Sequence, residues 1–294
     1  MRTIAATALV RVAALLGLGA AACRGGSTPA FQQLAEARRL ADDLRVQLAK
    51  TSNASDRAVM ADTDQESIAF ARDTEKAAGA IAVDRALLAA RLQSLDYAAE
   101  GRMLDDFGSH FAEYRQIERD VLDLAVQNTN LKAQRLSFGP VREAADQLHD
   151  ALAAAVTAAP PKDRCRIDGL VARAELALRE IQILQAPHIA EADDATMTKL
   201  EQEMADRQAT AREALKLLGW GATAAMTREL DAAKAALDRF DELSAELVAL
   251  SRRNSNVRSL ALALRRTPTL VAACDGSLAQ LQDALAKAGF TGTR

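Results

Sequence analysis

Three cysteines and three histidines are the most reactive side chains in this sequence, and neither set forms a catalytic or metal-binding motif. His110, His149 and His188 fall in separate segments, whereas zinc and di-iron sites need ligands at short, fixed spacings. The nearest approach, Asp146 before His149, stands alone, and His188 is interpreted as a helix-capping or surface residue. No glycine-rich phosphate loop, nucleophile elbow or Cys-x-x-Cys pair occurs. We therefore expect no enzymatic activity, no cofactor and no metal.

Arginine is the remaining residue type suited to ligand recognition, because its guanidinium binds carboxylates through two parallel hydrogen bonds. Four arginines inside predicted helices are candidates for binding a carboxylate ligand in this way: Arg72, Arg85, Arg173 and Arg179. The alternative, in which each is solvated or paired within its own helix, is favoured, so the ligand-binding residues are left unknown. The acidic segment at residues 191–194 is interpreted as favourable negative charge in the first turn of a helix, and not as a metal site.

Cys23 is the candidate for lipid attachment. Residues 1–22 have an apolar stretch that ends in small residues, which is typical of an export signal. Cys23 then resembles the modified cysteine of bacterial lipoproteins, although Arg11 interrupts the apolar stretch and Ala20 stands where leucine is usual. We expect a periplasmic protein anchored to a membrane through lipid on Cys23. Simple cleavage near Ala22 and an uncleaved anchor are the alternatives.

Cys165 and Cys274 remain in a chain expected to reach an oxidising compartment. An even count there predicts one disulfide, which would join the first and last helices of a second helical module. Two buried thiols that pack as small apolar side chains are the alternative.

The elements that would position these side chains are repeated. Apolar residues from Phe107 to Leu124 align at a constant offset of 126 residues with a second set from Ala233 to Leu250. The polar segment that follows also repeats, because residues 128–130 (Asn-Thr-Asn) become residues 254–256 (Asn-Ser-Asn). Apolar spacings of three and four residues indicate helices, so the pattern predicts a duplicated helical unit.

Composition agrees with an all-α fold. The 294 residues are 49% hydrophobic but only 3% aromatic, which favours alanine- and leucine-rich helices. The net charge is −3 with both signs interspersed, so no broad basic face for nucleic acid is expected. After the signal, no segment has 18 uncharged apolar residues, and no further membrane crossing is expected.

The predicted organisation is two tandem antiparallel four-helix bundles. Residues 1–22 form the signal peptide, 23–30 a tether, 31–158 the first bundle, 159–163 a proline-containing linker and 164–294 the second bundle. Helix breaks or kinks are predicted at residues 51–56 and at Pro140, Pro187 and Pro268. Leu148 aligns with Leu281 at an offset of 133, and the seven surplus residues are two helical turns that keep the apolar face in place.

Both copies resemble the extracytoplasmic four-helix-bundle sensor domain of bacterial methyl-accepting chemotaxis receptors. In that family the third helix carries spaced aromatic and leucine residues, ends at a Gly/Asn-containing bend and leads into a fourth helix with a proline-marked kink. The matching segments are Phe111 to Asn130 with Pro140, and Leu237 to Asn256 with Pro268. The resemblance covers nearly all of residues 31–288 and implies a module that binds a small molecule or a partner.

Such receptors also have a second membrane span, a coupling module and a cytoplasmic signalling hairpin, which this sequence lacks. We therefore expect a stand-alone, non-enzymatic sensor-like protein that a transmembrane receptor or kinase would read. The alternative is a structural or interaction protein of the cell envelope. A pocket with converging charges would favour sensing, and a large exposed apolar stripe would favour partner binding.

Overall fold

The computed structural model describes residues 29–288, which consist of helices and short links. The all-α prediction is confirmed, since these residues contain no strand. None of the helices they form combines the length and apolarity that crossing a membrane requires. The expected signal peptide, Cys23 and residues 289–294 lie outside the described residues. The helices are α1 (Pro29–Val59), α2 (Asp64–Ser94), α3 (Ala98–Ala125), α4 (Thr129–Leu136), the π-helix η1 (Ser137–Val141), α5 (Arg142–Thr157), α6 (Arg164–Ala190), α7 (Asp194–Gly219), α8 (Ala224–Arg253) and α9 (Ser255–Ala288).

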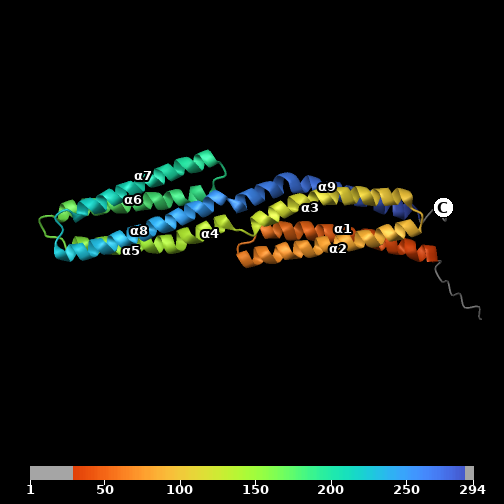
Figure 1. Cartoon of the computed structure of the whole chain (residues 1–294), viewed down its shortest axis with the longest axis horizontal. Helices are drawn as coiled ribbons and strands as arrows, with labels where there is room; N and C mark the ends of the chain where they lie inside the picture. Colours follow the sequence, from red (N-terminus) through yellow and green to blue (C-terminus); the bar gives the residue numbers. More distant parts are fainter. Residues whose placement is uncertain (1–28, 289–294) are drawn as a thin grey trace, which may run out of the picture.

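The helices lie in two elongated bundles that meet end to end (Figure 1). The terminal bundle consists of α1, α2, α3 and α9, and the central bundle of α4 to α8, with α4, η1 and α5 forming one bent helix. Each bundle has its own apolar core. Leu44 and Leu281 lie in the terminal core, and Leu148 and Phe240 lie in the central core.

These contacts correct the predicted division of the chain at residues 159–163. The prediction placed residues 31–158 in one bundle and 164–294 in the other. In the structure, α5 packs on α8 and α6, whereas α9 packs on α3 and α1. Arg45, for example, forms an ion pair with Asp275 across α1 and α9, with Nε 2.7 Å from Oδ1. The fourth helix of each repeat has therefore been exchanged into the other bundle.

Two asparagines mark the points where the chain crosses between bundles. Asn128 precedes α4 with φ of 50°, and Asn254 separates α8 from α9 with φ of 53°. This left-handed conformation is one that asparagine tolerates better than most other residues with a side chain. Each of these residues directly precedes the next helix, which continues along the long axis (Figure 1). The repeated Asn-Thr/Ser-Asn segment is thus a crossing point and not a reversal of direction.

The first turns of α4 and α9 cap each other at this crossing. Ser255 Oγ accepts a hydrogen bond from the Thr129 backbone N–H, and Thr129 Oγ1 accepts one from that of Ser255, both at 3.0 Å. Asn130 and Asn256 repeat the arrangement, each side-chain oxygen accepting from the other backbone N–H at 3.1 to 3.2 Å. These reciprocal bonds satisfy donors that helix starts leave without intrahelical partners.

The predicted helix interruptions are only partly correct. Helix α1 continues through residues 51–56, where the Thr51 hydroxyl donates to the Gln47 carbonyl at 2.8 Å. Helix α6 likewise includes Pro187 and ends at Ala190, and Pro268 lies inside α9. Pro140 does disturb its helix, because the surrounding turn is π-helical.

Candidate functional site

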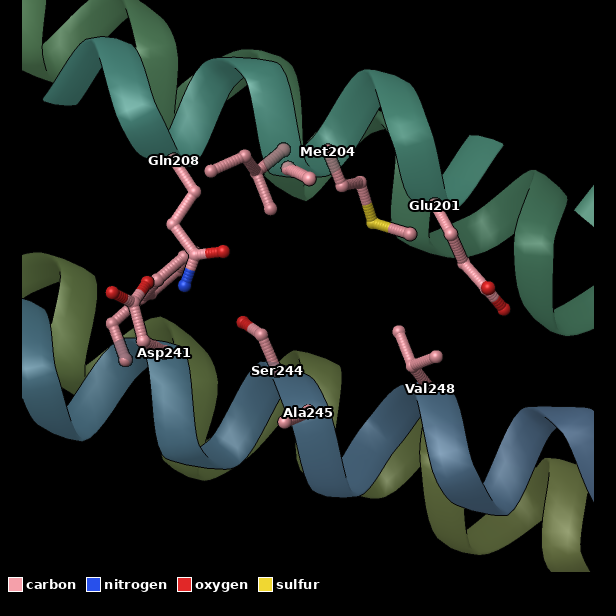
Figure 2. A pocket seen from close by; sticks show the side chains of 10 residues that line it. Glu201, Met204, Gln208, Asp241, Ser244, Ala245 and Val248 are labelled. Atoms are coloured by element: carbon pink, nitrogen blue, oxygen red, sulfur yellow. The ribbon is translucent and has the colours of Figure 1, made fainter. Parts of the chain in front are cut away.

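A cleft opens between α7 and α8 in the central bundle (Figure 2). Its volume is about 260 Å³, slightly below the range of about 300 to 1,000 Å³ that is typical of small-molecule sites. The walls are mainly apolar, with acidic side chains at the two ends and the Ser244 hydroxyl between them (Figure 2). The lining residues are Ile181, Glu201, Met204, Ala205, Gln208, Phe240, Asp241, Ser244, Ala245 and Val248.

Helical spacing explains why these side chains converge. On both α7 and α8 the lining residues recur at intervals of one, three and four positions, which places them on the facing side of each helix. Ala205 and Ala245 contribute little volume, so space remains that larger side chains would fill. Figure 2 shows Met204 and Ser244 directed into this space from opposite helices.

Asp241 presents a buried polar atom without a hydrogen-bond partner. The residue is 8% exposed, and its Oδ2 accepts from Arg212 Nη2 at 2.5 Å, but its Oδ1 is unpaired. The amide of Gln208 turns towards Asp241 (Figure 2) without reaching bonding geometry to Oδ1. Burial raises the pKa of Asp241 by more than Gln208 and Arg212 lower it. A buried acceptor left unpaired costs about 1–3 kcal/mol. A donor that reaches Oδ1 from the cleft is therefore favoured, but Oδ1 is itself covered, so a side-chain shift must first expose it.

Glu201 lies at the other end of the cleft, and its carboxylate is already engaged. Arg252 binds it through two hydrogen bonds, from Nε to Oε1 at 2.5 Å and from Nη2 to Oε2 at 2.9 Å. This pairing lowers the pKa of Glu201 below its usual value. His188 Nε2 lies 2.9 Å from the same Oε1. Glu201 therefore has less capacity for a ligand than Asp241.

The hydrogen bonds of His188 indicate where its protons lie. The Ser251 hydroxyl donates its single hydrogen to the His188 carbonyl at 2.9 Å, so the Nδ1 contact with that hydroxyl, also 2.9 Å, requires an N–H at Nδ1. The interpretation of His188 as a surface or capping residue is wrong, because its side chain is 0% exposed. It packs against α8 and α7 beneath the cleft.

The corresponding region of the terminal bundle can be identified by aligning the repeats. Helix α3 aligns with α8 at the offset of 126 residues, as the reciprocal caps show. Helices α2 and α7 align at 130, the difference between their first residues, Asp64 and Asp194. The buried positions agree with this offset, since Ser67, Thr74, Ile81 and Leu88 match Met197, Met204, Ala211 and Leu218. Tyr114, Arg115, Glu118 and Glu75 then occupy the places of Phe240, Asp241, Ser244 and Ala205.

Those four residues form a polar cluster where the central bundle has its cleft, with Tyr114, Arg115 and Glu118 buried and Glu75 exposed at its edge. Arg115 Nη2 binds Glu75 Oε2 at 2.6 Å, and its Nη1 donates to Glu118. The Tyr114 hydroxyl also donates to Glu118. Desolvation nevertheless raises the pKa of Glu118 to about 7. At the place of the cleft, the terminal bundle thus carries charged side chains that bind one another.

The predicted disulfide between Cys165 and Cys274 is wrong. Both thiols are free: Cys165 is exposed at the start of α6, and Cys274 is buried in the core of the terminal bundle. The prediction required the last helix to pack beside α6, and the exchange of fourth helices places it on α1 and α3 instead. Burial raises the pKa of Cys274 to about 12, which keeps it a thiol.

The candidate arginines are not brought together. Arg72 and Arg85 lie on α2, where Arg85 pairs with Asp105 at 3.4 Å, while Arg173 and Arg179 lie on α6 of the other bundle. None of them lines the α7/α8 cleft.

The other two histidines and the acidic segment 191–194 also have partners within the protein. His149 Nδ1 lies 2.7 Å from Glu175, and His110 Nδ1 lies 2.9 Å from the Ser277 hydroxyl. Asp193 caps α7 by accepting from the Thr196 N–H at 2.7 Å. Within the part of the chain that the structure describes, no group of three or more His, Cys, Asp or Glu side chains is placed to hold a metal ion.

A groove on the terminal bundle runs between the end of α1 and the middle of α9. Its volume is about 650 Å³, and Leu260, Ala263 and Val271 contribute to an apolar lining. Two of its side chains are unusually exposed for their type, Met60 at 77% and Leu264 at 69%. The groove has the character of an interaction surface.

Comparison of the chain with protein-family models and with curated proteins gives no match. The functional inference therefore depends on the geometry of the cleft. Sequence reasoning did not find Asp241 or Glu201, although one signal was present. At the aligned positions, Glu75 and Glu118 in one repeat give way to Ala205 and Ser244 in the other.

Proposed function

We propose that this protein is a non-enzymatic, extracytoplasmic sensor-like protein that binds a small molecule in the cleft between α7 and α8. The observation that carries this proposal is the buried, unpaired Oδ1 of Asp241 at one end of an apolar cleft. The other repeat supports it, because at the aligned place Arg115 binds Glu118 and Glu75, which Ser244 and Ala205 replace in the central bundle.

A thermal-shift screen with amino acids, organic acids and small amines tests the proposal. A ligand present at about 100 times its dissociation constant adds about 2.7 kcal/mol to the free energy of unfolding. Ser244→Leu, which fills the cleft from α8, should abolish the shift given by any hit. A set of hits that stabilise wild type and Ser244→Leu equally would place binding elsewhere and contradict the proposal.

The route by which binding is reported is part of the proposal. We propose that a lipid on Cys23 holds the bundles beside a membrane and that a transmembrane receptor or kinase reads the ligand-bound state. A tether of this kind raises the local concentration of such a partner. Labelled-palmitate incorporation should disappear in Cys23→Ser. Cell crosslinking of wild type should recover an envelope receptor or kinase, with recovery reduced in the Cys23 variant.

A structural or interaction protein of the cell envelope is the second candidate function, and the α1/α9 groove favours it. Exposed apolar side chains such as Met60 and Leu264 are suited to contact with another protein. Leu264→Asp should then reduce crosslinking to the envelope partner while leaving ligand-induced shifts intact. If Ser244→Leu abolishes ligand-induced thermal shifts and Leu264→Asp leaves crosslinking to the envelope partner unchanged, the sensor proposal is preferred.

A further inference from the structure

We infer that the ligand of the α7/α8 cleft is a small organic cation, a primary amine joined to a short apolar chain or ring. The inference rests on the proposed function and specifies its ligand. The ammonium group would donate to Asp241 Oδ1, and the apolar part would lie along Met204, Phe240 and Val248.

The charges that face the cleft favour a cation over an anion. The ionisable residues that line it, Glu201 and Asp241, are both acidic. Arg252 and His188 already engage Glu201, and Arg212 engages only Oδ2 of Asp241. The unfilled acceptor is therefore a carboxylate oxygen, which an ammonium satisfies with both a hydrogen bond and opposite charge. A carboxylate ligand would meet repulsion at the same point.

The terminal bundle contains an internal version of the same interaction. At the place of Asp241 it carries Arg115, whose guanidinium lies within the bundle and binds the carboxylates of Glu75 and Glu118. This region of the fold thus accommodates a cation bound to carboxylates when the chain supplies both. In the central bundle Ala205 and Ser244 replace those two carboxylates, and the buried carboxylate is Asp241, which Arg212 engages through Oδ2 alone. A free amine would supply a donor for Oδ1.

The size of the cleft limits the apolar part. Its volume of about 260 Å³ corresponds to about nine water-sized groups at about 30 Å³ each. An amine with about six to nine non-hydrogen atoms fits this space, as hexylamine or phenylethylamine would. The apolar side walls add hydrophobic burial to the charged contact.

The test compares three probes of one length, hexylamine, hexanol and hexanoate, against the full chain labelled at its methionine methyl groups. Met204 lines the cleft and reports binding directly, and Met60, in the α1/α9 groove, reports binding elsewhere. Hexylamine should shift the Met204 resonance and bind at least tenfold more tightly than hexanol, a difference of about 1.4 kcal/mol. Hexanoate should be the weakest of the three.

Variants separate the charge from the cavity. Asp241→Asn keeps the side-chain size and should weaken hexylamine at least tenfold while leaving hexanol unchanged. Asp238→Asn is the matched control, because Asp238 also pairs with Arg212, at 3.0 Å, but does not line the cleft. Ser244→Leu keeps the carboxylate and should remove binding of all three probes. It also provides a test if Asp241→Asn fails to fold.

The outcomes distinguish the ligand class from the proposed function. Equal or tighter binding of hexanol or hexanoate at Met204 overturns the amine assignment and leaves ligand binding in the cleft intact. The same conclusion holds if these probes fail but a compound from the screen that has no amino group shifts Met204, whereas a shift by another amine supports the assignment. Absence of any Met204 shift across the probes and the screen overturns both.

Discussion

Glu118 is a buried acid whose environment makes folding stability depend on pH. Desolvation raises its pKa from 4.5 to about 7, outweighing the hydrogen bonds from Tyr114 and Arg115. The folded protein thus retains a proton that the unfolded chain releases above about pH 4.5. A rise in pH through this window favours the unfolded chain. The terminal bundle should consequently be less stable at pH 8 than at pH 5 because of this group.

The predicted contribution is a loss of about 1–3 kcal/mol in the free energy of unfolding between about pH 4.5 and 7. Glu118→Gln should remove most of that dependence, since an amide does not titrate. Urea unfolding at a series of pH values measures it, with the exposed Glu242→Gln as control. A pH profile unchanged by Glu118→Gln would show that Glu118 is ionised in the fold.

The two resolved cysteines should differ in reactivity. Cys165 is exposed, whereas Cys274 is buried and its pKa is raised to about 12, so little thiolate forms at neutral pH. In native protein a maleimide should label Cys165 within minutes and Cys274 only in denaturant. Mass spectrometry of timed samples measures both. Rapid native labelling at Cys274 would contradict the packing of α9 in the terminal bundle.

The residues of the cleft were beyond sequence prediction for a definite physical reason. Asp241 and Glu201 have the helical positions of ordinary surface acids, and only the burial of one face of α8 against α7 distinguishes them. His188 was misassigned because a histidine after proline suggested a helix end, whereas α6 continues through Pro187.

At the level of helices, the reciprocal caps should couple the two repeats energetically. Thr129→Val and Ser255→Ala each remove the acceptor for a buried backbone N–H, which costs about 1–2 kcal/mol. The two hydroxyls also contact each other at 3.2 Å, so the double variant should depart from additivity by at least about 0.5 kcal/mol.

A double-mutant cycle by chemical denaturation measures this coupling. The control cycle pairs Ser255→Ala with Thr223→Ala, which removes the local cap of α8 at the Met226 N–H. That pair should be additive, because Thr223 caps the start of α8 and Ser255 lies just beyond its other end. Additivity in both cycles would mean that the reciprocal bonds contribute independently.

Helix positions were largely predictable, because apolar spacings of three and four residues persist through each element. The ends of the helices were harder to predict. The polar run at residues 51–56 suggested a break, but Thr51 and Ser55 are buried against neighbouring helices and α1 continues. The low helix propensity of these polar residues favours a break, but the packing of α1 against its neighbours outweighs that preference.

For the whole molecule, the exchange of fourth helices makes the terminal bundle dependent on the C-terminal helix. A chain that stops after Arg253 lacks α9, which packs against α1 and α3. Hydrogen exchange should then show lost protection in α1 to α3 and retained protection in α6 to α8. The sequential division predicted from sequence gives the opposite pattern, with loss in residues 164–253. The full chain serves as the reference.

The duplication was readable from sequence, whereas the pairing of its helices was not. An offset of 126 residues says that two units share a pattern, but it does not say which bundle each fourth helix joins. The direction taken at Asn128 and Asn254 decides the pairing. That direction depends on one left-handed residue and on bonds to a segment 126 positions away.

The exchanged helices also impose an order on folding. The bonds from Arg38 to the Leu285 carbonyl connect residues 247 positions apart, so the terminal bundle cannot close until nearly all of the chain has been synthesised. The central bundle needs only residues 129–253 and is complete earlier. Long-range closure of this kind is slow, and the faces of α1 and α3 that pack on α9 stay uncovered meanwhile. Those two faces are therefore the part of the nascent chain that most needs protection from aggregation.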